Sequence, residues 1–184
     1  MSGRIVLAEG KHLRLVREGR WEYAERTRAS GAVVLVAVTA DGRLLLTEQY
    51  RVPLACKVIE LPAGLTGDDD GHEQEAADQS ARRELLEETG YEAREMKLLT
   101  VGPPTAGLAN EVVSFFLATG LTKTGAGGGI ESEEIVVHEV PLSEVPAWLD
   151  QQAAGGMLID PKVYAGLFFA EREWREEGGR RKEE

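Results

Sequence analysis

Apolar residues recur along this chain with two spacings: alternate positions or short continuous runs in some segments, and every third or fourth position in others. The alternating and continuous runs predict strands, and the most apolar of them, residues 32–39, predicts a buried central strand. The predicted strands cover residues 5–8, 13–17, 21–26, 32–39, 43–50, 58–61, 95–101, 112–118 and 135–140. The helical spacing predicts helices over residues 75–89, 142–152 and 161–176.

The order of these segments predicts an α+β fold with an antiparallel β layer at the N-terminus. A chain of 184 residues suits one domain with a sizeable core. The short strands of residues 1–30 bury little surface by themselves, so this layer is expected to pack on something else, such as a second subunit. We expect the main domain to span residues 31–177 and a disordered tail to span residues 178–184.

The helix that ends at Gly90 carries acidic residues where they cost stability. Glu84, Glu87 and Glu88 lie in its last turns, where each acid opposes the helix dipole by about 0.3–1 kcal/mol. Glu84 and Glu88 lie one turn apart on a single face, so they also repel each other. Carboxylates that converge need cations, and oxygen ligands suit Mg²⁺ or Mn²⁺. The alternative is a solvated acidic end of a helix.

Charge and cysteine content exclude several classes of protein. Lys and Arg total 21 against 32 Asp and Glu, and this net charge of −11 argues against nucleic-acid or anionic-membrane binding. Cys56 is the single cysteine, so no disulfide forms within the chain and a cytoplasmic location is expected. The longest apolar run, residues 31–40, is shorter than the ~20 residues of a membrane-spanning helix.

A motif in the acidic helix resembles the second half of the Nudix box of the Nudix hydrolases, and it reads Arg83-Glu84-Leu85-x-Glu87-Glu88-x-Gly90-Tyr91. The first half of the box departs from the family pattern, because the spacer between Gly64 and Glu75 is longer than usual. The additional residues 68–72 enlarge the loop before the helix. They leave open whether Glu73 or Glu75 fills the role of the early glutamate.

The resemblance implies a Nudix fold, in which a mixed β-sheet core packs between helices. It also implies two or more Mg²⁺ or Mn²⁺ ions per site, held by Glu84 and Glu88. In this reading Glu87 is a third ligand or supports the others, and Arg83 orients Glu87 or a neighbouring carboxylate. Relatives that act on ADP-ribose also bind metal through a backbone carbonyl before the loop glycine, which here is Ala63.

The same relatives place a catalytic glutamate on a loop well after the box, and residues 131–134 occupy the matching place. Glu131 is the preferred candidate and Glu133 the second. A solvated acidic loop is the alternative for each of them. The glycines at 127–129 are expected to let this loop close over substrate.

Substrate recognition is expected from residues outside the box. By resemblance to ADP-ribose pyrophosphatases, Trp21 stacks on adenine, Arg26 contacts the pocket, and Arg51 reaches a phosphate. Gly107 lies in a loop, residues 103–111, that is similar to the post-box loop of the same branch. The alternatives are a core or interface role for Trp21, and surface pairing of the two arginines with the abundant acids.

These features predict a metal-dependent pyrophosphatase that cleaves ADP-ribose or a related nucleoside diphosphate sugar into a nucleoside monophosphate and a sugar phosphate. Relatives of this branch are homodimers that build the pocket from both chains, so a homodimer is expected. The first alternative is a preference for GDP-mannose or another nucleotide sugar. A non-catalytic nucleotide-binding Nudix module is more remote, because Glu84, Glu87 and Glu88 are all present.

Overall fold

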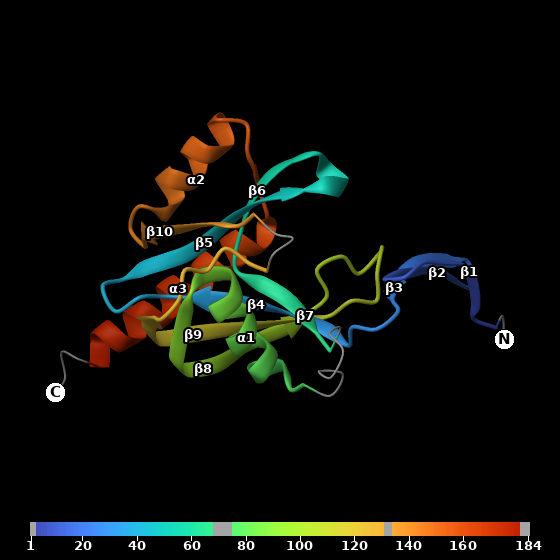
Figure 1. Ribbon diagram of the computed structural model, residues 1–184, viewed down its shortest axis with the longest axis horizontal. Helices are drawn as coiled ribbons and strands as arrows, with labels where there is room; N and C mark the ends of the chain where they lie inside the picture. Colours follow the sequence, from blue (N-terminus) through green and yellow to red (C-terminus); the bar gives the residue numbers. More distant parts are fainter. Residues whose placement is uncertain (1–2, 68–74, 131–133, 181–184) are drawn as a thin grey trace.

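A body of two four-stranded sheets and three helices, with a three-stranded sheet projecting from one end, makes up the described part of the chain (Figure 1). This computed structural model describes residues 3–67, 75–130 and 134–180, with side chains up to residue 175. The helices are α1 (Ala77–Thr89), α2 (Val145–Ala154) and α3 (Pro161–Arg180). The strands are β1 (Ile5–Glu9), β2 (Leu13–Glu18), β3 (Trp21–Arg26), β4 (Gly31–Ala37), β5 (Arg43–Arg51), β6 (Cys56–Glu60), β7 (Ala63–Thr66), β8 (Tyr91–Gly102), β9 (Val113–Lys123), β10 (Val136–Pro141) and β11 (Leu158–Ile159).

Strand β4 lies at the centre of the core, as its continuous apolar run predicts. It belongs to the sheet of order β7-β4-β9-β8, beside the sheet of order β10-β5-β6-β11. Its alternate residues enter two clusters: Val33 and Leu35 pack with Leu85 of α1, while Val34 and Val36 pack on the side of α2 and α3. Because the side chains of a strand alternate in direction, one strand supports helices on both of its faces.

The α+β class and the N-terminal antiparallel sheet are confirmed. Each predicted strand is present, with ends that differ by a few residues, and two short strands, β7 and β11, were not predicted. The predicted tail starts too early, because α3 continues through Gly178 and Gly179 to Arg180. None of the described helices is long and apolar enough to cross a membrane.

The glycine segment 127–129 is attached to the end of α1 instead of forming a free hinge. The Gly128 and Gly129 amides donate to the carbonyls of Glu88 and Glu87 over 2.8 and 3.0 Å. All three glycines have positive φ, and a Cβ on Gly127 would lie 2.5 Å from the carbonyl carbon of Thr89. These glycines allow close approach to the backbone of α1, and closure of the following loop over substrate stays a prediction.

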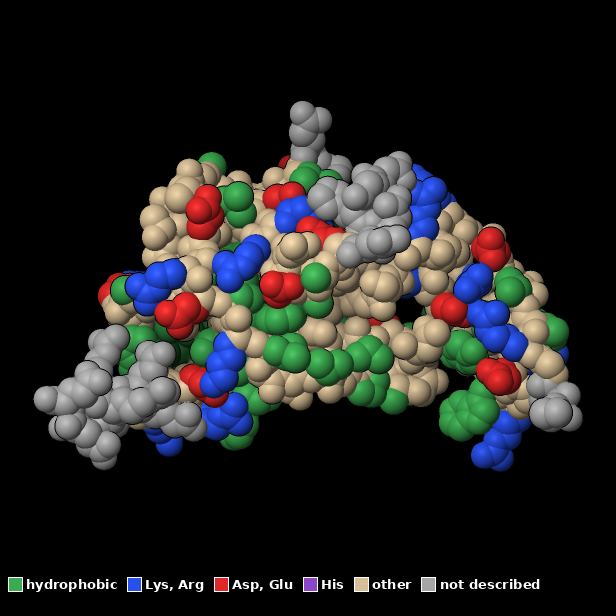
Figure 2. Space-filling model, turned by 90° about the horizontal axis from the view of Figure 1, so that it is seen from below, with side chains coloured by type: hydrophobic (Ala, Val, Ile, Leu, Met, Phe, Trp, Pro, Cys, Tyr) green, Lys and Arg blue, Asp and Glu red, His purple; other side chains and the backbone are tan. Residues whose placement is uncertain are grey.

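The N-terminal layer, β1 to β3, extends away from the body as an arm with interspersed basic and acidic side chains (Figure 2). Of the hydrophobic residues described in this layer (residues 3–30), Val16 alone is buried. Ile5, Leu13 and Leu15 are 41–50% exposed. The layer is joined to the loop after β8 by a backbone hydrogen bond of 2.8 Å from Ala24 to Leu108. Its apolar face therefore has little cover within one chain.

Candidate active site

A cleft of about 580 Å³ lies beside the C-terminal half of α1 and is lined by residues from both four-stranded sheets. The fold brings into it most of the residues singled out from the sequence. Those residues are Arg26, Arg51, Ala63, Arg83, Glu84, Glu87 and Glu88.

Glu84 and Glu88 lie against strand β7, at the floor of the cleft. Glu88 is 4% exposed, and its Oε2 accepts a hydrogen bond of 3.1 Å from the Ala63 amide. The Glu84 carboxylate lies over Gly64, where a Cβ would come within 1.9 Å of the Glu84 Cδ. Gly64 thus leaves space for a carboxylate on the strand backbone, and this placement explains a glycine in the middle of β7.

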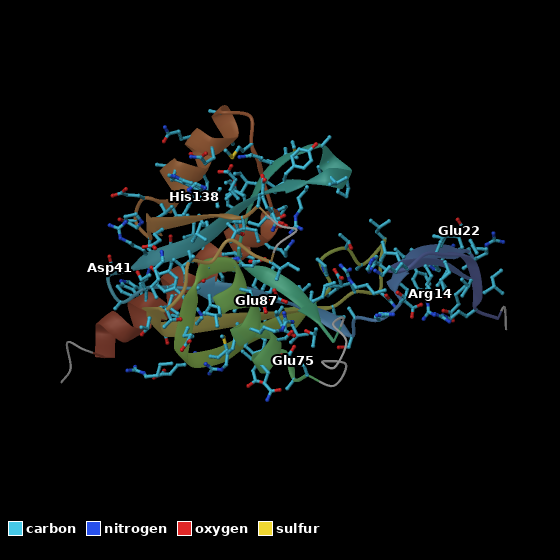
Figure 3. All side chains as sticks on the ribbon, viewed as in Figure 1. Arg14, Glu22, Asp41, Glu75, Glu87 and His138 are labelled. Carbon is cyan, nitrogen blue, oxygen red and sulfur yellow. The ribbon has the colours of Figure 1, made fainter. Side chains whose placement is uncertain are left out.

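Arg83 holds three acidic residues together. Its guanidinium lies 2.9 Å from Glu84 Oε1, 3.0 Å from Glu87 Oε2 and 3.4 Å from Glu75 Oε2. Figure 3 shows Glu75 and Glu87 close to α1 and far from the N-terminal arm. Burial disfavours the charge on Arg83, but attraction by Glu84, Glu87 and Glu75 outweighs burial and raises its pKa. Of the two candidates for the early glutamate, Glu75 contacts Arg83, whereas Glu73 lies outside the described residues.

The oxygen atoms at the floor of the cleft suit a hard divalent cation, because they belong to side-chain carboxylates and to the backbone carbonyls of β7. Within the described residues, no three His, Cys, Asp or Glu side chains are grouped as a metal ion would need. The reason is visible in the geometry, since Glu84 and Glu87 are turned toward Arg83. The space that Gly64 leaves for the Glu84 carboxylate supports the fit of such an ion.

Arg51 and Arg26 reach the cleft from two different sides, and each is held by an acid. Arg51 Nε donates to Glu60 Oε1 over 2.9 Å, and its second nitrogen also pairs with Glu60. Burial lowers the pKa of Arg51, but the hydrogen bond and charge of Glu60 outweigh burial and the pKa is raised. Arg26 pairs with Glu111, from the segment that precedes β9. Both arginines are thus paired with acids, and both pairs line the cleft.

Trp21 and Gly107 do not line this cleft. They border a separate depression of about 500 Å³, together with Tyr23 and Asn110. Trp21 is 57% exposed, with the Arg20 guanidinium 5.9 Å from the centroid of its ring. Within one chain, the structure does not bring the predicted base-stacking residue together with the predicted metal ligands.

Glu131 and Glu133, the predicted catalytic glutamates, lie outside the described residues, as does the inserted segment 68–72. Ile130, the last described residue before this gap, lines the cleft. The chain therefore approaches the cleft directly before the acidic residues.

Sequence reasoning missed Glu60, Asp160 and Lys162, which line the cleft together with Gln49 and Glu111 from the motifs around Arg51 and Gly107. Asp160 accepts a hydrogen bond of 2.8 Å from the Lys162 amide, at the first turn of α3. Its position directly before Pro161 is a helix-start signal that can be read from sequence. That the first turn of α3 lies at the cleft depends on the pairing of β11 with β6, which the sequence pattern does not indicate.

The two described histidines, His12 and His138, do not line the cleft. His138 lies on β10, where its Nε2 is 3.0 Å from Glu48 Oε2, and its ring centroid is 5.0 Å from that of Trp148. Lys57 Nζ contacts the other oxygen of Glu48 at 2.6 Å. None of these four residues lines the cleft, so this cluster around the buried Glu48 serves the packing of β10 and α2 on β5.

Comparisons with known proteins agree with this geometry. The chain is 32% identical over 152 residues to the methanol dehydrogenase activator of Bacillus methanolicus, covering 82% of this chain and 79% of the relative. It is 35% identical over 127 residues to the ADP-ribose pyrophosphatase of Bacillus subtilis (strain 168), covering 68% and 66%. It is 33% identical over 171 residues to the GDP-mannose pyrophosphatase of Klebsiella pneumoniae, covering 89% and 78%.

Among solved structures, a crystal structure described as an ADP compounds hydrolase superposes with a TM-score of 0.70. It covers 97% of this chain and 94% of that chain at 21% identity, so it supports the fold alone. The family model described as the NUDIX domain matches residues 27–160, which include the cleft residues from Arg51 to Asp160. The chain therefore belongs to the Nudix family.

Proposed function

We propose that this protein is a divalent-metal-dependent pyrophosphohydrolase of ADP-ribose or a related nucleoside diphosphate sugar, with a nucleoside monophosphate and a sugar phosphate as products. The observation that carries the proposal is the cleft itself, which combines the glutamates of the Nudix helix with two arginines from other elements. Guanidinium groups recognise phosphate oxygens. Neighbouring carboxylates suit a divalent metal, which would neutralise the charge of the diphosphate. The names of the Bacillus subtilis and Klebsiella pneumoniae relatives support this substrate class.

In this mechanism Glu84 and Glu88 would hold the metal, with Glu87 as a third ligand or a support, and the carbonyl of Ala63 would complete the set. Mg²⁺ or Mn²⁺, in two or more sites, supplies neutralisation of phosphate charge and a lower pKa for bound water. Arg83 holds Glu84 and Glu87 in place before metal arrives. Arg51 and Arg26 orient the diphosphate. Glu131, and next Glu133, remain our candidates for the group that accepts the proton of the attacking water.

The test of this proposal is product analysis with ADP-ribose and GDP-mannose, each with and without Mg²⁺. We expect metal-dependent formation of AMP and ribose 5-phosphate from ADP-ribose, measured by chromatography. Cleavage of GDP-mannose but not of ADP-ribose would support the pyrophosphatase reaction and make GDP-mannose the assigned substrate. A folded protein that cleaves neither compound, nor any other nucleotide sugar, would contradict the proposal and favour a non-catalytic binding module.

We also propose that the active form is a cytoplasmic homodimer that does not bind nucleic acid. The support is the N-terminal layer, whose Ile5, Leu13 and Leu15 are exposed and whose Trp21 lies outside the cleft of its own chain. A second copy that covers this layer would bury the apolar face and place an aromatic ring near a cleft. Analytical ultracentrifugation should give twice the chain mass of 20.1 kDa.

Replacing Trp21 with Ala should raise the KM for ADP-ribose about 5- to 150-fold with little change in kcat, because base stacking contributes about 1–3 kcal/mol per base. Steady-state kinetics measures both constants. Phe168→Ala is the matched control, since Phe168 is a 62%-exposed aromatic residue of α3 that lines neither the cleft nor the Trp21 depression. An unchanged KM in Trp21→Ala would show that the base is bound elsewhere.

A further inference from the structure

Each basic side chain of the cleft outside the Nudix helix is already held by an acid of the same cleft. Arg51 is paired with Glu60, and Arg26 with Glu111. Lys162 pairs with Asp160 at the start of α3. These acids lie outside the Nudix box, so the metal chemistry proposed above does not use them. Their presence in a cleft for an anionic substrate calls for a separate explanation.

The cleft as a whole also has no excess of positive charge. Among the described residues that line the cleft, four are basic and six are acidic, which leaves a formal charge of −2. The six acidic residues are Glu60, Glu84, Glu87, Glu88, Glu111 and Asp160. Metal ions bound at the Nudix helix would offset only the negative charge of Glu84, Glu87 and Glu88. Beyond the metal site, the arginines and the lysine are matched one for one by acids, so no surplus positive charge remains for further phosphates.

Glu60 is fixed in this position by its surroundings. It is 7% exposed, and its two oxygens are held by Arg51 and by Gln49 Nε2, the latter over 3.2 Å. The charges of Glu88 and Asp160 also raise the pKa of Arg51, and both acids line the same cleft. Contacts from these two neighbours on both of its oxygens hold the Glu60 carboxylate beside Arg51. Its negative charge therefore stays beside the arginine that we assign to phosphate.

Glu111 has the equivalent place on the other side of the cleft. Its side chain is 21% exposed, and it holds Arg26 at the end of β3. Acids thus accompany both phosphate-binding arginines. A diphosphate that is esterified at both ends has no terminal phosphate, whereas a free terminal phosphate carries about −1.5 to −2 charge at neutral pH. The additional charge of such a nucleotide would be repelled by these fixed carboxylates.

We propose that Glu60 and Glu111 are specificity-determining residues that restrict the cleft to diphosphates capped at both ends by uncharged groups. Nucleotides with a free terminal phosphate, such as ADP and ATP, are rejected by charge. The inference rests on the proposed function, and it explains why the cleft would select a diphosphate that is capped at both ends. It assigns to two acids a role that neither the Nudix motif nor the metal requires, since specificity here comes from repulsion of the wrong ligand.

The test compares ADP-ribose with ADP, which share the base, the ribose and the diphosphate and differ only in the cap. We measure the KM for ADP-ribose and the Ki of ADP, in Mg²⁺, for wild type, Glu60→Gln and Glu111→Gln. We expect the ratio of Ki to KM to fall about tenfold in each variant, the size expected for removal of one nearby unit charge in a partly solvated cleft. An unchanged ratio in folded variants would overturn the inference.

The matched control is Glu171→Gln, which removes the same charge from an exposed pair with Arg175 on α3 and should leave the ratio unchanged. If Glu60→Gln does not fold, Glu111→Gln decides alone, because Glu111 is more exposed. If the wild type cleaves no ADP-ribose, the proposed function fails, and calorimetric dissociation constants for ADP and ADP-ribose replace KM and Ki. A wild type that binds ADP as tightly as ADP-ribose would then refute the charge selection.

Discussion

Glu88→Gln is expected to lower kcat for ADP-ribose hydrolysis by about a hundredfold or more, because a lost metal ligand removes several kcal/mol of transition-state stabilisation. The structure indicates that this substitution lowers activity without disturbing the fold. Glu88 is 4% exposed and accepts a hydrogen bond from the Ala63 amide, and a glutamine oxygen can accept the same bond. The variant therefore keeps the shape and the contact to β7 while it loses the charge.

The measurement is steady-state kinetics beside Mn²⁺ binding followed by calorimetry, with thermal unfolding as the check on folding. Glu22→Gln is the control, because Glu22 lies in an exposed pair with Arg17 on the N-terminal arm, far from α1 (Figure 3). We expect weaker Mn²⁺ binding in Glu88→Gln and none of these changes in Glu22→Gln. Activity close to wild type in Glu88→Gln would refute the assignment of Glu88 as a metal ligand.

Gly90→Ala is expected to lower the free energy of unfolding by about 2–4 kcal/mol, which corresponds to a fall in Tm of about 5–15 °C. Gly90 ends α1 in the left-handed conformation, with φ of 75°, where a side chain is strained. A Cβ there would lie 2.3 Å from the Gly125 carbonyl oxygen and 2.8 Å from the Gly127 amide nitrogen. Both atoms belong to backbone, so the clash cannot be relieved by rotating a side chain.

Gly102→Ala provides the matched comparison, because no heavy atom lies within 4 Å of a Cβ built there and its φ is not in the left-handed region. Differential scanning calorimetry of both variants gives the two values of Tm. Equal and small shifts would show that the segment after β9 yields easily to the extra methyl group. A large shift in Gly90→Ala alone would confirm that position 90 requires a glycine, for its left-handed φ and for its close contact with residues 125–127.

The order of strands and helices could be read from the sequence because it depends on local periodicity and on turn residues. The run at 32–39 is β4, and the acidic helix ends at Gly90 as its composition predicts. The Nudix motif indicated Arg83, Glu84, Glu87 and Glu88 because i,i+4 spacing is set by helix geometry alone. The family membership and the α+β class follow from these same local features.

The tertiary arrangement decided what surrounds these residues. Pairings between distant strands place Glu60, Glu111 and Asp160 beside the Nudix helix, and no local pattern encodes such contacts. The glycine segment 127–129 had the composition of a hinge, yet its amides are bound by the carbonyls of α1. Trp21 lies outside its own cleft because the N-terminal arm points away from the body. Periodicity specifies a helix face or a strand, whereas the partner of each charge depends on which distant segments pack together.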